Sequence, residues 1–174
     1  MIKIGLGYGS FDIARRKHTI LNLKKDATII FSGIASIGRG TSIKVDPNAK
    51  LTFGNNFSCN ANCLLSCSST IVFEDDVTLG WNVSMFDWDG HNIVDIIGEQ
   101  IINKAKPIKI GKGSWLFANS TITKGVVLEK ENIVPFGSII TKSNDRQFCI
   151  YGGIPNRILK ENVARKDQYK TFIY

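Results

Sequence analysis

The sequence predicts an all-β fold of the parallel β-solenoid kind, on three observations. An aliphatic residue recurs at every sixth position between Ile110 and Ile140, a period that neither a helix nor a flat strand produces. A small or narrow side chain follows four positions after each of the first five, where a corner would crowd the axis. A looser form of this pattern begins near residue 27, and short strands that turn corners and stack have these features. The aliphatic series is Ile110, Leu116, Ile122, Leu128, Val134 and Ile140, and the small series is Ser114, Ser120, Val126, Asn132 and Ser138.

The length and composition suit a single domain of residues 1–174. The chain is 43% hydrophobic and 21% charged, as in ordinary globular proteins. It contains no run of about 18 apolar residues, so no membrane span is predicted. Three of the four cysteines lie four residues apart, but no histidine stands near them in sequence to complete a zinc site. We therefore expect reduced core cysteines and no metal.

The segments follow in order. Residues 1–26 show no repeat and are expected to cap the solenoid, and residues 27–150 form the predicted β-helix. Within it, the apolar frame shifts by two residues between Leu65 and Phe73, which predicts a bulge or a longer corner near residues 68–71.

Two later segments depart from the repeat. Residues 86–109 (FDWDGHNIVDIIGEQIINKAKPIK) are too long for a tight corner and are expected to leave the solenoid as an excursion loop, a kind of segment that is usually functional. Residues 151–174 form a C-terminal tail. In it, the run NRILKENVARKDQYK after Pro155 predicts a short C-terminal helix.

The net charge of +7 lies at the two ends of the chain. Residues 1–25 carry +5, residues 26–141 carry −2 and residues 142–174 carry +4. Such ends suit the phosphates of a cofactor or the head groups of a membrane surface, so peripheral membrane association is one expected partnership. No nucleic-acid-binding module accompanies the charge, and nucleic acid is not an expected partner. The opening MIKIGLGYGS lacks a long apolar export region, which favours a cytoplasmic location.

His91 is the leading candidate for chemistry. It stands at the root of the excursion, after Asp87, Trp88, Asp89 and Gly90. There it could face a groove as a general base, or it could be a loop histidine that hydrogen-bonds a carboxylate, and the residues alone leave both open. The other histidine, His18, follows three basic residues and is expected at the surface.

Four stretches resemble the hexapeptide-repeat acyltransferases, and in particular the sugar and polysaccharide O-acetyltransferases that include the maltose and galactoside acetyltransferases. They are residues 79–93 (LGWNVSMFDWDGHNI), 106–111 (KPIKIG) with Trp115, 137–142 (GSIITK) and 153–157 (GIPNR). The resemblance covers about residues 27–160. It implies a left-handed parallel β-helix, a homotrimer with active sites between neighbouring subunits, and acetyl-CoA as the donor.

The resemblance also implies roles for single residues. His91 would be the general base, and Asp89 would either orient its imidazole or cap the turn at Gly90. Asn60, Asn82 and Asp87 would contact the acceptor, although Asn60 is almost as well explained by an asparagine corner and turn formation is the favoured role for Asp87. The positions that match the family's coenzyme A contacts are Trp115, Ala118, Ser138, Lys142 and Arg157.

Phe117 and Phe136 depart from the family pattern. They stand where the family usually has Gly and Ala, which let a ligand approach the backbone. The rings would either stack against the cofactor or narrow its tunnel.

The sequence therefore predicts an acetyl-CoA-dependent O-acetyltransferase that acts on a sugar hydroxyl of a cell-surface glycan or its precursor. Two alternatives stay open. One is N-acetylation of an amino sugar on the same fold. The other is a non-catalytic β-helical binding or scaffold subunit in which Phe117 and Phe136 fill a dead donor groove.

Overall fold

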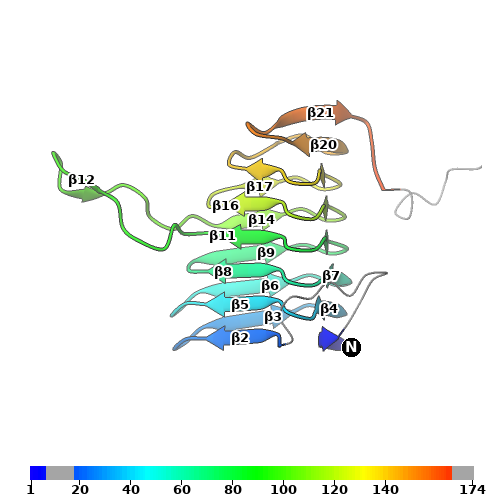
Figure 1. Ribbon diagram of the computed structural model, residues 1–174, viewed down its shortest axis with the longest axis horizontal. Coiled ribbons are helices and arrows are strands. Elements are labelled where there is room, and N and C mark those ends of the chain that lie inside the picture. Colours follow the sequence, from blue (N-terminus) through cyan, green and yellow to red (C-terminus); the bar gives the residue numbers. More distant parts are fainter. Residues whose placement is uncertain (7–17, 166–174) are drawn as a thin grey trace, which may run out of the picture.

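The computed structural model describes residues 1–6 and 18–165, and in them the predicted parallel β-solenoid is confirmed. The chain winds through stacked coils whose strands form three faces (Figure 1). Face 1 has eight strands, face 2 has six and face 3 has five. Within each face, neighbouring strands are parallel, except for the last pair of face 1.

The strand bounds follow by face. Face 1 contains β1 (Ile2–Leu6), β4 (Ala35–Gly38), β7 (Phe57–Cys59), β10 (Thr78–Leu79), β15 (Trp115–Leu116), β18 (Ile133–Val134), β20 (Cys149–Gly152) and β21 (Arg157–Glu161). Face 2 contains β2 (Ile20–Leu23), β5 (Ser42–Val45), β8 (Leu64–Cys67), β11 (Ser84–Phe86), β16 (Thr121–Thr123) and β19 (Ile139–Ile140). Face 3 contains β3 (Thr28–Phe31), β6 (Lys50–Phe53), β9 (Thr70–Phe73), β14 (Ile108–Ile110) and β17 (Val127–Leu128).

The six-residue repeat builds the core of the later coils. Its aliphatic side chains are fully buried, and Leu116 pairs with Val134, 18 residues further along. Three repeats therefore make one coil with three faces. The small residues of the repeat are also buried, as expected for side chains that must fit inside a corner.

The two-residue frame shift between Leu65 and Phe73 is present in the structure. Through the strand register Leu65 is equivalent to Ile122 and Phe73 to Leu128, so the chain takes eight positions from face 2 to face 3 here and six in the later coil. Four residues (46–49) separate β5 from β6, whereas Ser68 and Ser69 alone separate β8 from β9. The corner is two residues shorter than the one below it but two residues longer than the regular corner of the later coil, so the prediction of a longer corner is confirmed.

The excursion is present and leaves the corner between faces 2 and 3. β11 ends at Phe86 and β14 begins at Ile108. Between them, β12 (Val94–Asp95) and β13 (Gln100–Ile101) form an antiparallel hairpin. Figure 1 shows this arm projecting from the stack.

The two ends differ from their expected forms. β1 and β2 pair in parallel with β4 and β5, so residues before 27 already contribute a coil. The predicted C-terminal helix is wrong for the described part of the tail. Arg157–Glu161 is the strand β21, which pairs antiparallel with β20, because an edge strand at the end of a stack has unpaired backbone groups that a returning strand satisfies. The rest of the predicted helix, residues 166–170, lies outside the described residues.

In the part of the chain that the structure describes, no helix is long and apolar enough to cross a membrane.

Candidate functional site

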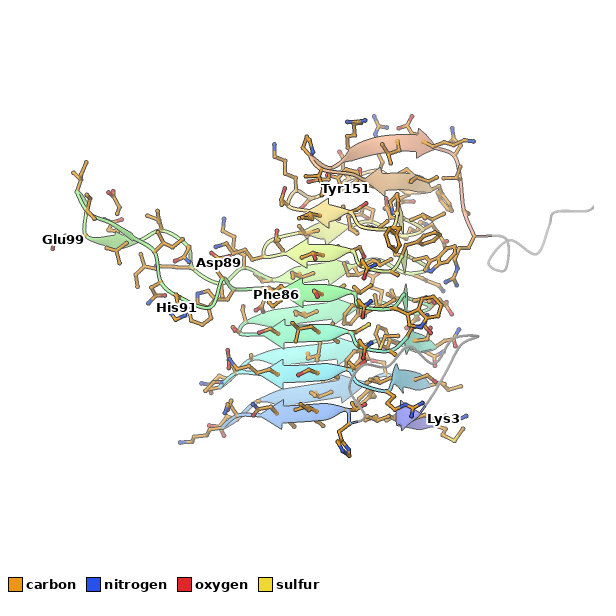
Figure 2. The ribbon with its side chains drawn as sticks, in the orientation of Figure 1. Lys3, Phe86, Asp89, His91, Glu99 and Tyr151 are labelled. Atoms are coloured by element: carbon orange, nitrogen blue, oxygen red, sulfur yellow. The ribbon has the colours of Figure 1, made fainter. Side chains whose placement is uncertain are left out.

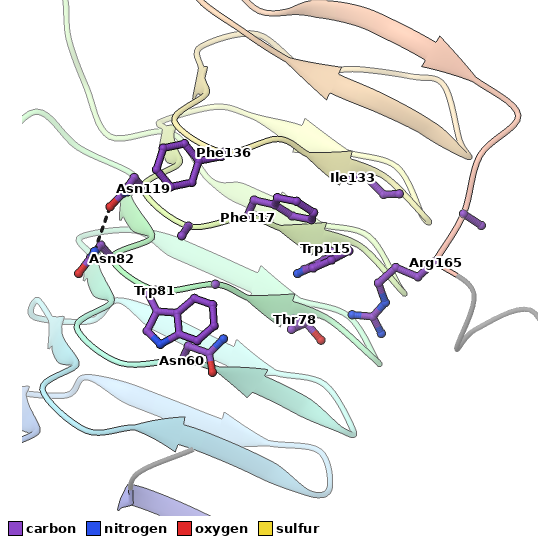
Figure 3. Close-up of a pocket in the computed structure, with 13 residues that line it drawn as sticks. Asn60, Thr78, Trp81, Asn82, Trp115, Phe117, Asn119, Ile133, Phe136 and Arg165 are labelled. Atoms are coloured by element: carbon purple, nitrogen blue, oxygen red, sulfur yellow. Dashed lines mark hydrogen bonds between the residues drawn. The ribbon is translucent and has the colours of Figure 1, made fainter. Parts of the chain in front are cut away.

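A groove with a volume of about 1220 Å³ runs along the corner between faces 1 and 2 (Figure 3). The corners of successive coils supply its floor, and they stack tightly. A Cβ added to Gly80 would lie 2.5 Å from the backbone nitrogen of Ala118. Glycine is therefore required where these two corners touch. The groove is lined by Asn60, Thr78, Gly80, Trp81, Asn82, Trp115, Phe117, Ala118, Asn119, Ile133, Phe136, Ala164 and Arg165.

Aromatic side chains make one wall of the groove. The ring centroids of Trp115 and Phe117 are 3.9 Å apart at an interplanar angle of 53°. Phe136 lines the same groove with 66% of its surface exposed. Both phenylalanines at the departures from the family pattern therefore form walls of an open groove.

Asparagine amides line the groove on the opposite side from Arg165 (Figure 3). The Asn82 Nδ2 atom donates to the Asn119 Oδ1 atom over 3.0 Å. The two residues hold equivalent corner positions in consecutive coils, since Leu79 pairs with Leu116. Both adopt positive φ, 57° for Asn82 and 59° for Asn119, a conformation that asparagine tolerates better than most residues.

The groove brings together four of the predicted site residues, namely Asn60, Asn82, Trp115 and Ala118. The other three predicted cofactor residues lie outside its lining. Ser138 is 2% exposed, and its hydroxyl accepts a hydrogen bond of 3.0 Å from the Gly153 backbone nitrogen. Lys142 and Arg157 are exposed, on the loop after β19 and on β21. The ligand roles of all seven stay predictions.

His91 lies on the excursion, outside the stacked coils (Figure 2). Its side chain is exposed, and within residues 1–6 and 18–165 its imidazole makes no hydrogen bond. It does not line the groove. The excursion projects from the corner between faces 2 and 3, whereas the groove follows the corner between faces 1 and 2. A single chain therefore does not bring His91 to its own groove.

Asp89 fixes the chain around His91 and does not contact the imidazole. Its carboxylate forms an ion pair with the Lys124 ammonium and accepts from the Asn103 Nδ2 atom over 2.9 Å. The same amide nitrogen donates to the His91 carbonyl oxygen over 2.7 Å, and the Asn103 Oδ1 atom accepts from the Ile93 nitrogen over 2.6 Å. Lys124 and Asn103 hold the pKa of the Asp89 carboxyl below its ordinary value.

A second, smaller pocket lies at the root of the excursion. Its volume is about 460 Å³. Phe86 forms part of its floor and pairs in register with Ser66 and Thr123 on face 2. The pocket is lined by Lys44, Ser66, Phe86, Trp88, Asp89, Gly90 and Thr123.

Asp87 is buried inside the fold. Its two carboxylate oxygens accept hydrogen bonds from the backbone nitrogens of Ser68, over 2.6 Å, and Ser69, over 2.7 Å. Burial raises the pKa of the Asp87 carboxyl, and these N–H donors lower it by less. Asp87 thus anchors the corner between β8 and β9, which fits the favoured turn role, and its acceptor role stays a prediction that burial disfavours.

The four cysteines are free and buried. Burial raises the pKa of the Cys67 thiol to about 12, with the Asp87 charge as the second cause. Such a thiol is protonated and unreactive near neutral pH. In the described residues, no group of three or more His, Cys, Asp and Glu side chains could hold a metal ion.

Comparison with known proteins connects this geometry to a family. No family model matches the chain. The galactoside O-acetyltransferase of Escherichia coli K12 is 25% identical over 84% of this chain and 73% of its own length. The solved structure of NeuO, a polySia-specific acetyltransferase, is 27% identical with a TM-score of 0.67, over 82% of this chain and 70% of that one. In sequence pattern and in fold, the chain is similar to the hexapeptide-repeat acyltransferases. Its solenoid is the left-handed β-helix of these enzymes.

A galactoside acetyltransferase solved in complex with coenzyme A shares the fold of this chain. It matches with a TM-score of 0.56 and 23% identity, over 87% of this chain and 70% of that one.

Several residues that shape the candidate site were not predicted. Asn119 could have been found from its equivalence to Asn82 once the excursion is set aside. Asn103, Lys124 and Arg165 gave no signal, because the fold brings them to their partners from distant parts of the chain.

Proposed function

We propose that the chain transfers the acetyl group of acetyl-CoA to a sugar hydroxyl of a cell-surface glycan or its precursor, with His91 as the general base. The observation that carries the proposal is the open aromatic groove, which contains Asn60, Asn82, Trp115 and Ala118, in a chain with the acetyltransferase fold. A cytoplasmic location and peripheral membrane association stay predictions.

The residues of the groove fit the proposed donor. The apolar walls of Trp115 and Phe136 suit the slender pantetheine arm, and asparagine amides offer partners to its amide groups. Lys142 and Arg157 are exposed toward the β21 end of the solenoid, where cations could bind phosphates. Phe117 packs on Trp115 and leaves the groove open.

The proposed chemistry needs one proton acceptor. His91 takes the proton of the sugar hydroxyl as that oxygen bonds to the acetyl carbon, the carbon–sulfur bond breaks, and the proton passes to the sulfur of coenzyme A. Neutral imidazole can do this because one ring nitrogen has a free lone pair. The network of Asp89, Asn103 and Lys124 fixes the backbone of His91, so the imidazole is presented from an anchored loop.

We propose a homotrimer in which the excursion of one subunit reaches the groove of the next. The excursion ends in apolar side chains with little cover in a single chain. Ile96 is 90% exposed, Ile97 is 92% exposed and Ile102 is 64% exposed. Exposed apolar clusters of this kind mark contact surfaces. A neighbouring copy would cover them and bring His91 to a groove that its own chain does not offer.

The test is acetyl transfer by wild type, His91→Gln and, as a matched control, His18→Gln. Thiol release from acetyl-CoA is followed with a panel of glycans, and the product is analysed by mass spectrometry. We expect an acetyl ester, a loss of about 10²–10⁴-fold in rate for His91→Gln, and an unchanged rate for His18→Gln. An amide product would instead indicate N-acetylation of an amino sugar. Failure of the wild type to bind coenzyme A at millimolar concentration would indicate the scaffold alternative.

A further inference from the structure

Arg165 is the one charged side chain among the described residues that line the large groove. The other lining residues are aromatic, aliphatic, glycine, asparagine or threonine. A single cation in an otherwise neutral groove has a marked effect on ligand choice, because its attraction to an anion is strengthened by apolar surroundings.

The guanidinium of Arg165 is held by an aromatic ring. Its Cζ atom lies 5.8 Å from the ring centroid of Trp115. A guanidinium over an indole face gains cation–π attraction and has its planar fork oriented. The chain reaches this place after β21, where the Val163 nitrogen donates to the Phe148 carbonyl oxygen over 2.9 Å. Glu131 lies close enough for Arg165 to lower the pKa of its carboxyl, against the larger effect of burial that raises it, but Glu131 does not line the groove.

The place of Arg165 along the groove separates it from the proposed donor phosphates. Ala118 follows β15, and the remaining donor positions continue toward β21, where Lys142 and Arg157 supply cations. Arg165 instead lies beside Thr78 of the preceding coil, near the level of Asn60 along the solenoid but across the groove from it (Figure 3). Asn60 is the residue expected to contact the acceptor.

We propose that the acceptor is an acidic saccharide whose carboxylate is bound by Arg165. This inference rests on the proposed function and narrows its substrate class. A guanidinium offers a carboxylate two parallel hydrogen bonds, a geometry that neither a neutral sugar nor a lysine can reproduce. The charge distribution agrees, since the chain carries +7 in total and +4 within residues 142–174, and such a field speeds the arrival of an anionic glycan.

The experiment uses the full chain and paired acceptors. Short sialic-acid and uronic-acid oligosaccharides are compared with the same oligosaccharides after their carboxyl groups are reduced to alcohols. Binding is measured by calorimetry, and kcat/KM is measured by thiol release from acetyl-CoA. We expect the wild type to favour an acidic form by about tenfold or more, mainly through KM and Kd. In Arg165→Gln that preference should disappear, and in Arg165→Lys it should be partly kept.

Arg146→Gln is the matched control, because Arg146 is exposed, lies outside the groove and has Glu161 as its ion-pair partner at 4.0 Å. It should keep the wild-type preference for acidic acceptors. Coenzyme A and its dephospho form are titrated into wild type and Arg165→Gln in parallel. If Arg165→Gln weakens coenzyme A but not dephospho-coenzyme A, Arg165 binds the donor phosphate and the inference is overturned.

Two further results separate this inference from the proposed function. Equal binding and equal turnover of acidic and reduced acceptors by the wild type would overturn the acidic-acceptor inference alone. Preferred binding of acidic saccharides without any thiol release would support the role of Arg165 and contradict the acetyltransferase activity.

Discussion

The Asp87 side chain fixes the backbone at the corner between β8 and β9. It is fully buried, and its two oxygens satisfy the backbone nitrogens of Ser68 and Ser69. Asp87→Ala would leave both N–H groups without these acceptors, at about 1–3 kcal/mol for each buried donor. We therefore expect the free energy of unfolding, measured in urea, to fall by about 2–5 kcal/mol.

Asp145→Ala is the matched control for that change, since Asp145 is an exposed carboxylate in the loop after β19. It should alter the free energy of unfolding by less than about 0.5 kcal/mol. Equal stabilities of Asp87→Ala and the wild type would contradict the anchoring role.

Asn103 links the two sides of the excursion near His91. Its amide contacts the Ile93 nitrogen, the His91 carbonyl oxygen and the Asp89 carboxylate. We expect Asn103→Leu to lower acetyl transfer by about tenfold, because a base displaced by an ångström loses that much or more. The midpoint of thermal unfolding should change little, because the excursion lies outside the core.

Hydrogen exchange provides the measurement for Asn103→Leu. The Ile93 amide should exchange faster, whereas amides of the coils should not change. Asn92→Leu, an exposed neighbour on the same excursion, serves as the control and should behave like the wild type. Full activity in Asn103→Leu would show that the anchored loop is not needed.

For single residues, the sequence predicts those that stand in local motifs. It does not predict the side chains from other coils that contact them. His91, Asn60 and Trp115 stand in recognisable stretches. Lys124 meets Asp89 from 35 residues away, across neighbouring coils, and nothing in either stretch indicates the meeting. The contact depends on the length of each coil and on the register between coils. Neither can be counted from the sequence where the excursion interrupts the repeat.

Among the elements, face 3 of the early coils is held by stacked phenylalanines. The ring centroid of Phe53 lies 5.1 Å from that of Phe31, with an interplanar angle of 15°. It lies 5.4 Å from that of Phe73, with an interplanar angle of 5°. The ring of Phe57, from β7 on face 1, is tilted against the ring of Phe53, and their centroids are 4.6 Å apart. This aromatic column links three successive coils through their interior.

Phe53→Ala tests the column. Phe53 is fully buried, and its truncation should lower the free energy of unfolding by about 3–5 kcal/mol, because the surrounding coils cannot close over the cavity. The measurement is denaturation in urea. Phe136→Ala removes an equal ring from the exposed groove wall and should leave the stability nearly unchanged. A similar loss in both variants would show that the column has no special role.

The elements also show where local propensity fails. The six-residue repeat determines the later coils because every sixth side chain must enter a narrow interior. After Pro155, the helix-forming residues of the run NRILKENVARKDQYK are overruled by the open edge of β20, which β21 covers. Such an edge exists only once the solenoid is built, so a local sequence pattern cannot reveal it.

At the scale of the whole molecule, the proposed catalytic parts lie on different corners. His91 is carried on the arm between faces 2 and 3, and the groove follows the corner between faces 1 and 2. A site that needs both would form only between copies of the chain. A closed ring of identical contacts supplies one such site at each interface.

Mixed subunits test this claim most directly. Two variants are prepared, His91→Ala, which lacks the base, and Ala118→Trp, which fills the groove, and each should be folded but inactive alone. Co-assembled in equal amounts, they should recover about a quarter of the wild-type rate of thiol release, the share of interfaces that pair an intact His91 with an intact groove. Mixtures that show trimers by light scattering and no recovered activity would contradict a site shared between subunits.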